Sequence, residues 1–134
     1  MANQEQLALL KQGADVWTAW RKEHPDIQPD LAEADLVGVD LKKANLSFAN
    51  LNEADLTLAN LKEANLAGAS LFMALLVNAN LSRANLSRTN FTSATLTAAT
   101  LTSAELTEAN LTAAKLPAAK LVNLPRFGGH GSSK

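Results

Sequence analysis

Leucine recurs at every fifth position along most of the chain, and this spacing dominates the pattern of hydrophobic and polar residues. From Leu31 to Leu121 there are 19 consecutive positions at this spacing, and only Phe91 is not leucine. The position two residues before each leucine is almost always alanine. The residue between the two is Asp or Asn in most units of the first half. A register this long indicates a single repeating architecture.

The five-residue period fits neither an α-helix nor a flat strand. Five residues of α-helix turn through about 500°, which would scatter the leucines around the axis without forming a buried face. On a flat strand, an odd period sends successive leucines to opposite faces. The chain must therefore bend once per five residues, so that every leucine points inward. Repeated bending in one sense predicts a solenoid with backbone hydrogen bonds between successive coils.

The units ADLVG, ANLSF, ADLTL and ANLKE follow the pattern A-(D/N)-L-X-X, which resembles the pentapeptide-repeat family over roughly residues 30–124. The resemblance implies an all-β solenoid, a right-handed quadrilateral β-helix with four five-residue sides in each coil of about 20 residues. In that fold the leucines would stack in columns with about 4.8 Å between coils. Each buried leucine contributes roughly 1.5–3 kcal/mol, so the core explains the repeat without any ligand.

The N-terminal segment lacks the repeat and has a helical pattern. Residues 4–24 are predicted to form a helix that is interrupted at Gly13. We expect Trp17 and Trp20 to cover the open end of the leucine columns, and a partner-binding aromatic surface is the alternative. The predicted division of the chain is a short α-helical N-terminal cap (1–29), the pentapeptide-repeat β-helix (30–124), and a C-terminal closure with a flexible tail (125–134).

Composition and charge exclude several classes of function. The formal net charge is −1, so the chain lacks the basic footprint expected for direct nucleic-acid binding or attraction to an anionic membrane. There is no Cys, which excludes disulfides and thiolate chemistry. No secretory signal and no 18-residue apolar segment are evident, so we expect a cytoplasmic protein without membrane insertion.

The sequence offers no constellation for catalysis. His24 and His130 lie at opposite ends of the chain, and no metal-ligand spacing or Gly-rich phosphate loop is present. Asp30, Asp35 and Asp40 fall on successive sides of a coil, where they are expected to form turns rather than an acid/base pair. We therefore predict that the protein is not an enzyme and has no catalytic, metal or cofactor site.

Threonines in the segment 95–102 raise the alternative of an ice-binding array, which needs the same Thr pair stacked on one face. The positions one coil away from Thr95 and Thr97 are Leu75, Val77, Lys115 and Pro117, so no Thr lattice forms. These threonines are better explained by the preference of β-branched residues for extended structure.

The segment ASLFMALLVNANL, residues 69–81, departs most from the repeat. Phe72, Met73, Leu75 and Val77 occupy positions that are polar elsewhere, and Leu58 would lie near them one coil earlier. An exposed apolar patch on a polar rod commonly marks a contact surface, so these five residues form a candidate protein-binding patch. Alternatively, the side chains fold back on the solenoid wall or onto the N-terminal segment.

These observations predict a non-enzymatic protein-binding or scaffold module, a monomer or end-to-end dimer, whose specific role and protein partner the sequence does not identify. The resemblance also implies an alternative, because some family members mimic DNA and inhibit or protect DNA gyrase. A rod of about 23 Å would then need roughly 13 net negative charges. The solenoid has nine acidic and seven basic residues, a net charge of only −2. A DNA supercoiling assay distinguishes a gyrase-directed DNA mimic from a general protein-binding scaffold. The family is abundant in cyanobacteria, so a cyanobacterial origin is expected from the resemblance.

Overall fold

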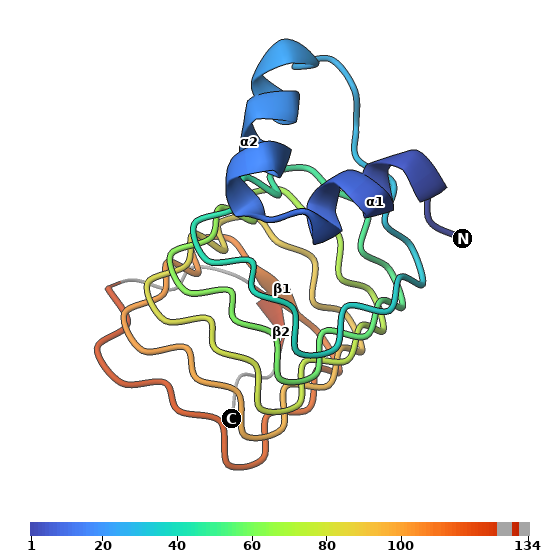
Figure 1. Ribbon diagram of the computed structural model, residues 1–134. Helices are drawn as coiled ribbons and strands as arrows, with labels where there is room; N and C mark the ends of the chain where they lie inside the picture. The colour runs from blue at the N-terminus through green and yellow to red at the C-terminus, as the bar shows by residue number, and fades with distance from the viewer. Residues whose placement is uncertain (126–129, 132–134) are drawn as a thin grey trace.

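Two short helices precede a stack of four-sided coils in the computed structural model of the protein (Figure 1). The structure describes residues 1–125 and the backbone of residues 130–131. The helices are α1 (Gln4–Lys11) and α2 (Ala14–Glu23). The short strands β1 (Asn110–Leu111) and β2 (His130–Gly131) pair in parallel, and isolated parallel β-bridges join the successive coils over the rest of the described solenoid.

Each coil contains 20 residues, because parallel bridges join every bridging residue to the residue 20 positions later, from Asp30–Asn50 to Thr100–Lys120. Four bridging positions, five residues apart, fall in each coil and give it four sides. The four-sided solenoid that the five-residue period and the family resemblance predicted is therefore confirmed. We name the sides A, B, C and D by the inward residues of the first coil and their equivalents every 20 residues: Leu31, Leu36, Leu41 and Leu46 respectively.

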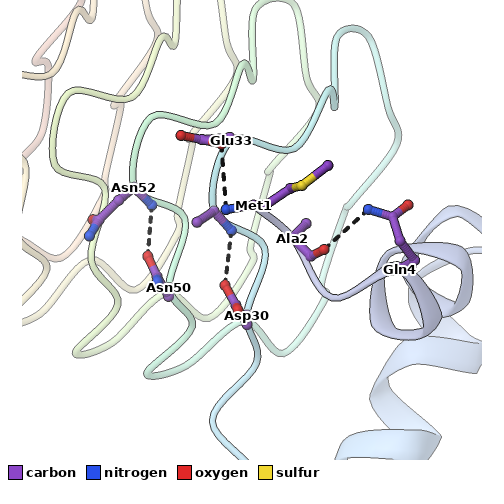
Figure 2. Close-up of polar contacts among 8 residues, drawn as sticks. Met1, Ala2, Gln4, Asp30, Glu33, Asn50 and Asn52 are labelled. Carbon is purple, nitrogen blue, oxygen red and sulfur yellow. Dashed lines mark hydrogen bonds and ion pairs between the residues drawn. The ribbon is translucent and has the colours of Figure 1, made fainter.

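The chain turns at the end of each side through two residues, the second of which has a left-handed backbone, with φ of 63° at Glu33 and 61° at Glu53. The Asp or Asn before the inward residue supports this turn with its side chain. Figure 2 shows this in successive coils, where Asp30 Oδ1 accepts from the Ala32 N–H (3.3 Å) and Asn50 Oδ1 from the Asn52 N–H (3.0 Å). The recurring carboxylates thus stabilise turns, as the sequence predicted.

The core consists of the stacked inward residues and the alanines beside them. From Leu31 to Leu111, every inward Leu or Phe91 is at most 2% exposed. Thr89 occupies an alanine position and is also fully buried. Its hydroxyl donates to the Leu66 carbonyl oxygen at 2.8 Å, so its polar group is satisfied inside the core.

The helices pack on the first coil, as Figure 1 shows at the N-terminal end of the stack. Gly13, with φ of 122°, separates α1 from α2 where the sequence predicted an interruption. Leu10 and Trp17 are fully buried in the same core as the leucine columns. Trp20 lies between Trp17 and His24, with ring centroids 5.1 Å and 4.9 Å away.

Backbone groups at the edge of the first coil have no preceding coil to pair with, and the N-terminal segment supplies partners for several of them. The Asn45 carbonyl oxygen accepts from Trp17 Nε1 (2.7 Å) and from Arg21 (2.9 Å), and the Ser47 carbonyl oxygen accepts from Arg21 (3.0 Å). On side A, Gln6 Oε1 accepts from the Asp30 N–H at 2.7 Å. Burial lowers the pKa of Arg21 through desolvation, and the guanidinium stays protonated at neutral pH.

Truncation of a leucine in the middle of the stack should destabilise the whole solenoid. We expect Leu71→Ala to lower the free energy of unfolding by about 2–5 kcal/mol, because the closely packed column leaves a cavity. Urea unfolding followed by circular dichroism measures the change. Ser93→Ala is the control, since Ser93 is exposed and Ala113 occupies the equivalent turn position one coil later. Equal losses in the two variants would contradict the role of the column.

Arg21 should hold α2 on the first coil. We expect Arg21→Met to increase the amide hydrogen exchange of residues 14–23 by about 10-fold or more, because hydrogen bonds from a buried charged group are lost. Exchange in residues 50–110 should change much less. Lys22→Met, at an exposed neighbouring position, is the matched control. Unaltered exchange of α2 in Arg21→Met would show that the apolar contacts alone hold the helix.

Candidate functional site

The apolar patch consists of Leu58, Phe72, Met73, Leu75 and Val77, and it lies on sides A and B of the second and third coils. Phe72 and Met73 are 38% and 48% exposed, Leu75 41% and Leu58 60%, and Val77 is partly buried. The Leu58 N–H donates to the Val77 carbonyl oxygen at 2.9 Å, which places these two residues side by side in adjacent coils. The structure therefore places the five predicted residues on two neighbouring sides of two successive coils.

The side chains of the apolar patch do not pack beneath the N-terminal segment. The side-chain hydrogen bonds of α1 and α2 to the solenoid reach Asp30, Asn45 and Ser47, all in the first coil. Four of the five patch side chains are exposed to solvent. Packing onto the N-terminal segment, the alternative raised by the sequence together with packing on the solenoid wall, would bury these side chains more completely.

Leu75 removes a turn-stabilising hydrogen bond that the fold makes elsewhere. One coil earlier, Asp55 occupies the equivalent position and its Oδ1 accepts from the Thr57 N–H at 3.1 Å. The side chain of Leu75 has no acceptor for the Val77 N–H. Leu75 therefore exposes an apolar side chain and lacks the local hydrogen bond that Asp55 makes one coil earlier.

The turn before Phe72 has a substitute for the missing acceptor. Ser70 stands where most units have Asp or Asn, and Asn52 of the preceding coil accepts both from the Phe72 N–H (3.1 Å) and from the Ser70 hydroxyl. This contact between coils holds the backbone of Phe72 and Met73. The apolar patch is therefore presented from a turn that remains hydrogen-bonded.

Two exposed apolar residues of the first coil were missing from the sequence prediction. Val37 occupies the same turn position of side B as Val77, two coils earlier, and the 20-residue register is the signal that could have placed it there. Phe48 lies on side D against Gly68, where an added Cβ would be 2.6 Å from the Phe48 ring. Phe48 therefore lies outside the apolar patch, on side D of the first coil.

A hollow of about 640 Å³ lies between the α1–α2 connection and side C of the first coil. Its charged residues are Asp15, Asp40, Lys42 and Lys43, and none of its lining residues is His, Cys, Ser or Thr. The hollow thus contains balanced charges but no pair of nucleophile and base.

Metal-ligating side chains do not converge in the described part of the chain. Over residues 1–125, no three His, Cys, Asp or Glu side chains come together in a way that could hold a metal ion. His24 stacks on Trp20 and its Nδ1 lies 3.0 Å from the Trp20 carbonyl oxygen.

Neither helix has the length and apolar character needed to cross a membrane.

The sequence profile of the pentapeptide repeats matches the chain with eight copies, over residues 28–57, 40–74, 59–97 and 74–112. These matches cover most of the solenoid, and the chain belongs to the pentapeptide repeat family. The resemblance in the A-(D/N)-L-X-X units is thereby confirmed. Among curated proteins, no sequence matches the chain.

Several solved structures of the family are similar to the chain. A pentapeptide repeat protein from the thylakoid lumen of Arabidopsis thaliana is 33% identical, with a TM-score of 0.45, over 67% of this chain and 59% of that one. Rfr23 from the cyanobacterium Cyanothece 51142 is 35% identical, with a TM-score of 0.41, over 69% and 56%. HetL from Nostoc, involved in the regulation of heterocyst differentiation, is 30% identical, with a TM-score of 0.26, over 72% and 57%. The chain spans a little over half the length of these proteins.

Restoring the repeat at Leu75 should leave the fold intact or strengthen it. We expect Leu75→Asn to keep or raise the free energy of unfolding, by up to about 1.5 kcal/mol, because the new side chain can accept from the Val77 N–H. Urea unfolding measures this, and Leu76→Asn, at the adjacent buried position, should be strongly destabilised. A clear loss of stability in Leu75→Asn would mean that the exposed leucine serves the fold.

Proposed function

We propose that the protein is a non-enzymatic scaffold that binds another protein through the apolar patch. The observation that carries this proposal is the exposure of Phe72, Met73 and Leu75 at positions where the repeat tolerates polar residues. Apolar side chains grouped on an otherwise polar surface commonly mark a contact with another molecule. The left-handed backbone at Leu58 and Met73, with φ of 64° and 59°, does not favour apolar residues and so gives no structural reason for them.

The proposal includes two features of the scaffold itself. The first is right-handed winding of the coils, which membership of the family supports. The second is a capping role for α1 and α2, supported by the burial of Leu10 and Trp17 against the leucine columns and by the hydrogen bonds to Asn45 and Ser47. A capped end leaves fewer unpaired backbone groups for non-specific association.

DNA mimicry directed at gyrase is less well supported by the distribution of charge. Side C carries an excess of basic residues along the solenoid, and a DNA-like surface would be acidic throughout. The charged residues of side C are Asp40, Lys42, Lys43, Lys62, Glu63, Arg83 and Lys120. The apolar patch on sides A and B also has no counterpart in the charge pattern of a duplex.

The proposal predicts that a partner is lost when the apolar patch is made polar. A variant with Phe72→Asn, Met73→Ser and Leu75→Asn should fail to capture a protein that the unaltered chain captures from a lysate of the source organism. Quantitative mass spectrometry of the captured proteins measures the difference, after circular dichroism shows that both chains fold.

The matched control changes Ser82→Asn and Arg83→Ser, which occupy the same two turn positions in the same coil on the opposite side C. This control should retain the partner. Capture that survives in the patch variant, or is lost equally in the control, would overturn the proposal.

A further inference from the structure

The charges around the apolar patch are unequally distributed. Glu53 precedes Met73 by one coil in the same column of side A, and its N–H donates to the Phe72 carbonyl oxygen at 2.8 Å. Asp55 precedes Leu75 in the same way on side B, joined to it by a β-bridge. On the C-terminal border of the patch, the equivalent residues are Ser93 and Thr95, which are uncharged. A carboxylate therefore lies one coil from each of two patch residues, and on one border only.

The acidic character extends over both sides that carry the apolar patch. Sides A and B hold five acidic residues and a single basic one, at the far end of side B. These residues are Asp30, Glu33, Asp35, Glu53 and Asp55, with Lys115 as the base. The Met1 amino group pairs with Glu33 at 3.4 Å (Figure 2). Over the described residues, Glu53 and Asp55 make no ion pair; Glu53 is exposed, and Asp55 is partly buried with its Oδ1 accepting from the Thr57 N–H.

We propose that the apolar patch binds a protein segment in which an apolar anchor is followed or preceded closely by Lys or Arg. The inference rests on the proposed function and specifies the chemistry of its partner. Successive coils are about 4.8 Å apart, so a basic side chain within about four residues of the anchor would reach Glu53 or Asp55 while the anchor contacts Phe72 or Leu75. Opposite charges at the border of an apolar contact speed association and exclude acidic partners.

The same carboxylates argue against the other common occupants of an apolar surface. An anionic membrane or a nucleic acid would place phosphates against Glu53 and Asp55, where like charges repel. A second copy of this chain that met the patch with its own patch in parallel orientation would bring the acidic borders of sides A and B together, and an antiparallel copy would set each acidic border against the uncharged border at Ser93 and Thr95. A polypeptide segment with both apolar and basic residues is the binding partner that complements the apolar patch and its acidic border.

A library of random 16-residue peptides, displayed and selected on the immobilised full chain, tests the inference. Peptides that also bind the Leu75→Asn variant are removed in each round. We expect the surviving peptides to be enriched in aromatic or aliphatic residues with Lys or Arg within four positions. Survivors rich in apolar residues without an excess of Lys and Arg would overturn the basic partner but leave the proposed function standing. If no peptide depends on Leu75, both fail.

The most enriched peptide, made with a fluorescent label, then tests the two carboxylates directly. We expect Glu53→Gln combined with Asp55→Asn to weaken its binding by about 2- to 10-fold in fluorescence anisotropy, and less at high salt. The Asn side chain keeps the acceptor for the Thr57 N–H, so the turn is retained. Glu63→Gln combined with Asp40→Asn removes two carboxylates from side C, in the second and first coils, and should leave the affinity unchanged. Equal affinities of the unaltered chain and the Glu53/Asp55 variant would overturn the inference.

Discussion

The registration of each inward leucine over the one 20 residues earlier is the constraint on which the rest of the structure depends. It fixes the parallel backbone hydrogen bonds, such as Leu31 N–H to the Asn50 carbonyl oxygen at 2.8 Å, and places every residue on one of four sides. A slip by one residue would turn the leucines outward and leave Asp and Asn facing the core. Because the columns specify the fold so strongly, the outward positions are free to vary, and the surface can carry information that the core does not.

The sequence allowed the solenoid to be predicted because its signal is repeated many times and is simple in physical terms. One leucine in five excludes helix and flat strand, whereas the number of sides needed the family resemblance, since a five-residue bend is compatible with more than one polygon. The partners of the first coil could not be predicted. Arg21 looks like an ordinary surface residue of a helix, and only its distance to the Asn45 and Ser47 carbonyl oxygens reveals that it is buried there.

The apolar patch was visible in the sequence because a regular repeat makes every departure conspicuous. Phe72, Met73 and Leu75 interrupt a polar pattern, but the sequence alone left open whether they were exposed. The structure adds their exposure, the hydrogen bond that Leu75 forgoes, and the position of Glu53 and Asp55 on a single border. Inward positions determine the stability of this fold and outward positions determine its surface chemistry, so a substitution at one kind of position has little effect on the other property.

The uniform coil length also has consequences for how such a chain tolerates changes in length. Leu58 and Val77 lie side by side because they are 19 positions apart in the sequence. The patch therefore depends on the number of residues between its members as well as on their identity. Loss of one five-residue unit between them would preserve the repeat and the core, yet rotate everything beyond it by a quarter turn and carry Leu75 and Val77 from side B to side A. Gain of a whole coil would keep each residue on its side but separate the two along the axis. Insertions and deletions of whole repeat units therefore rotate or shift one part of the solenoid surface relative to another, and they leave the fold itself intact.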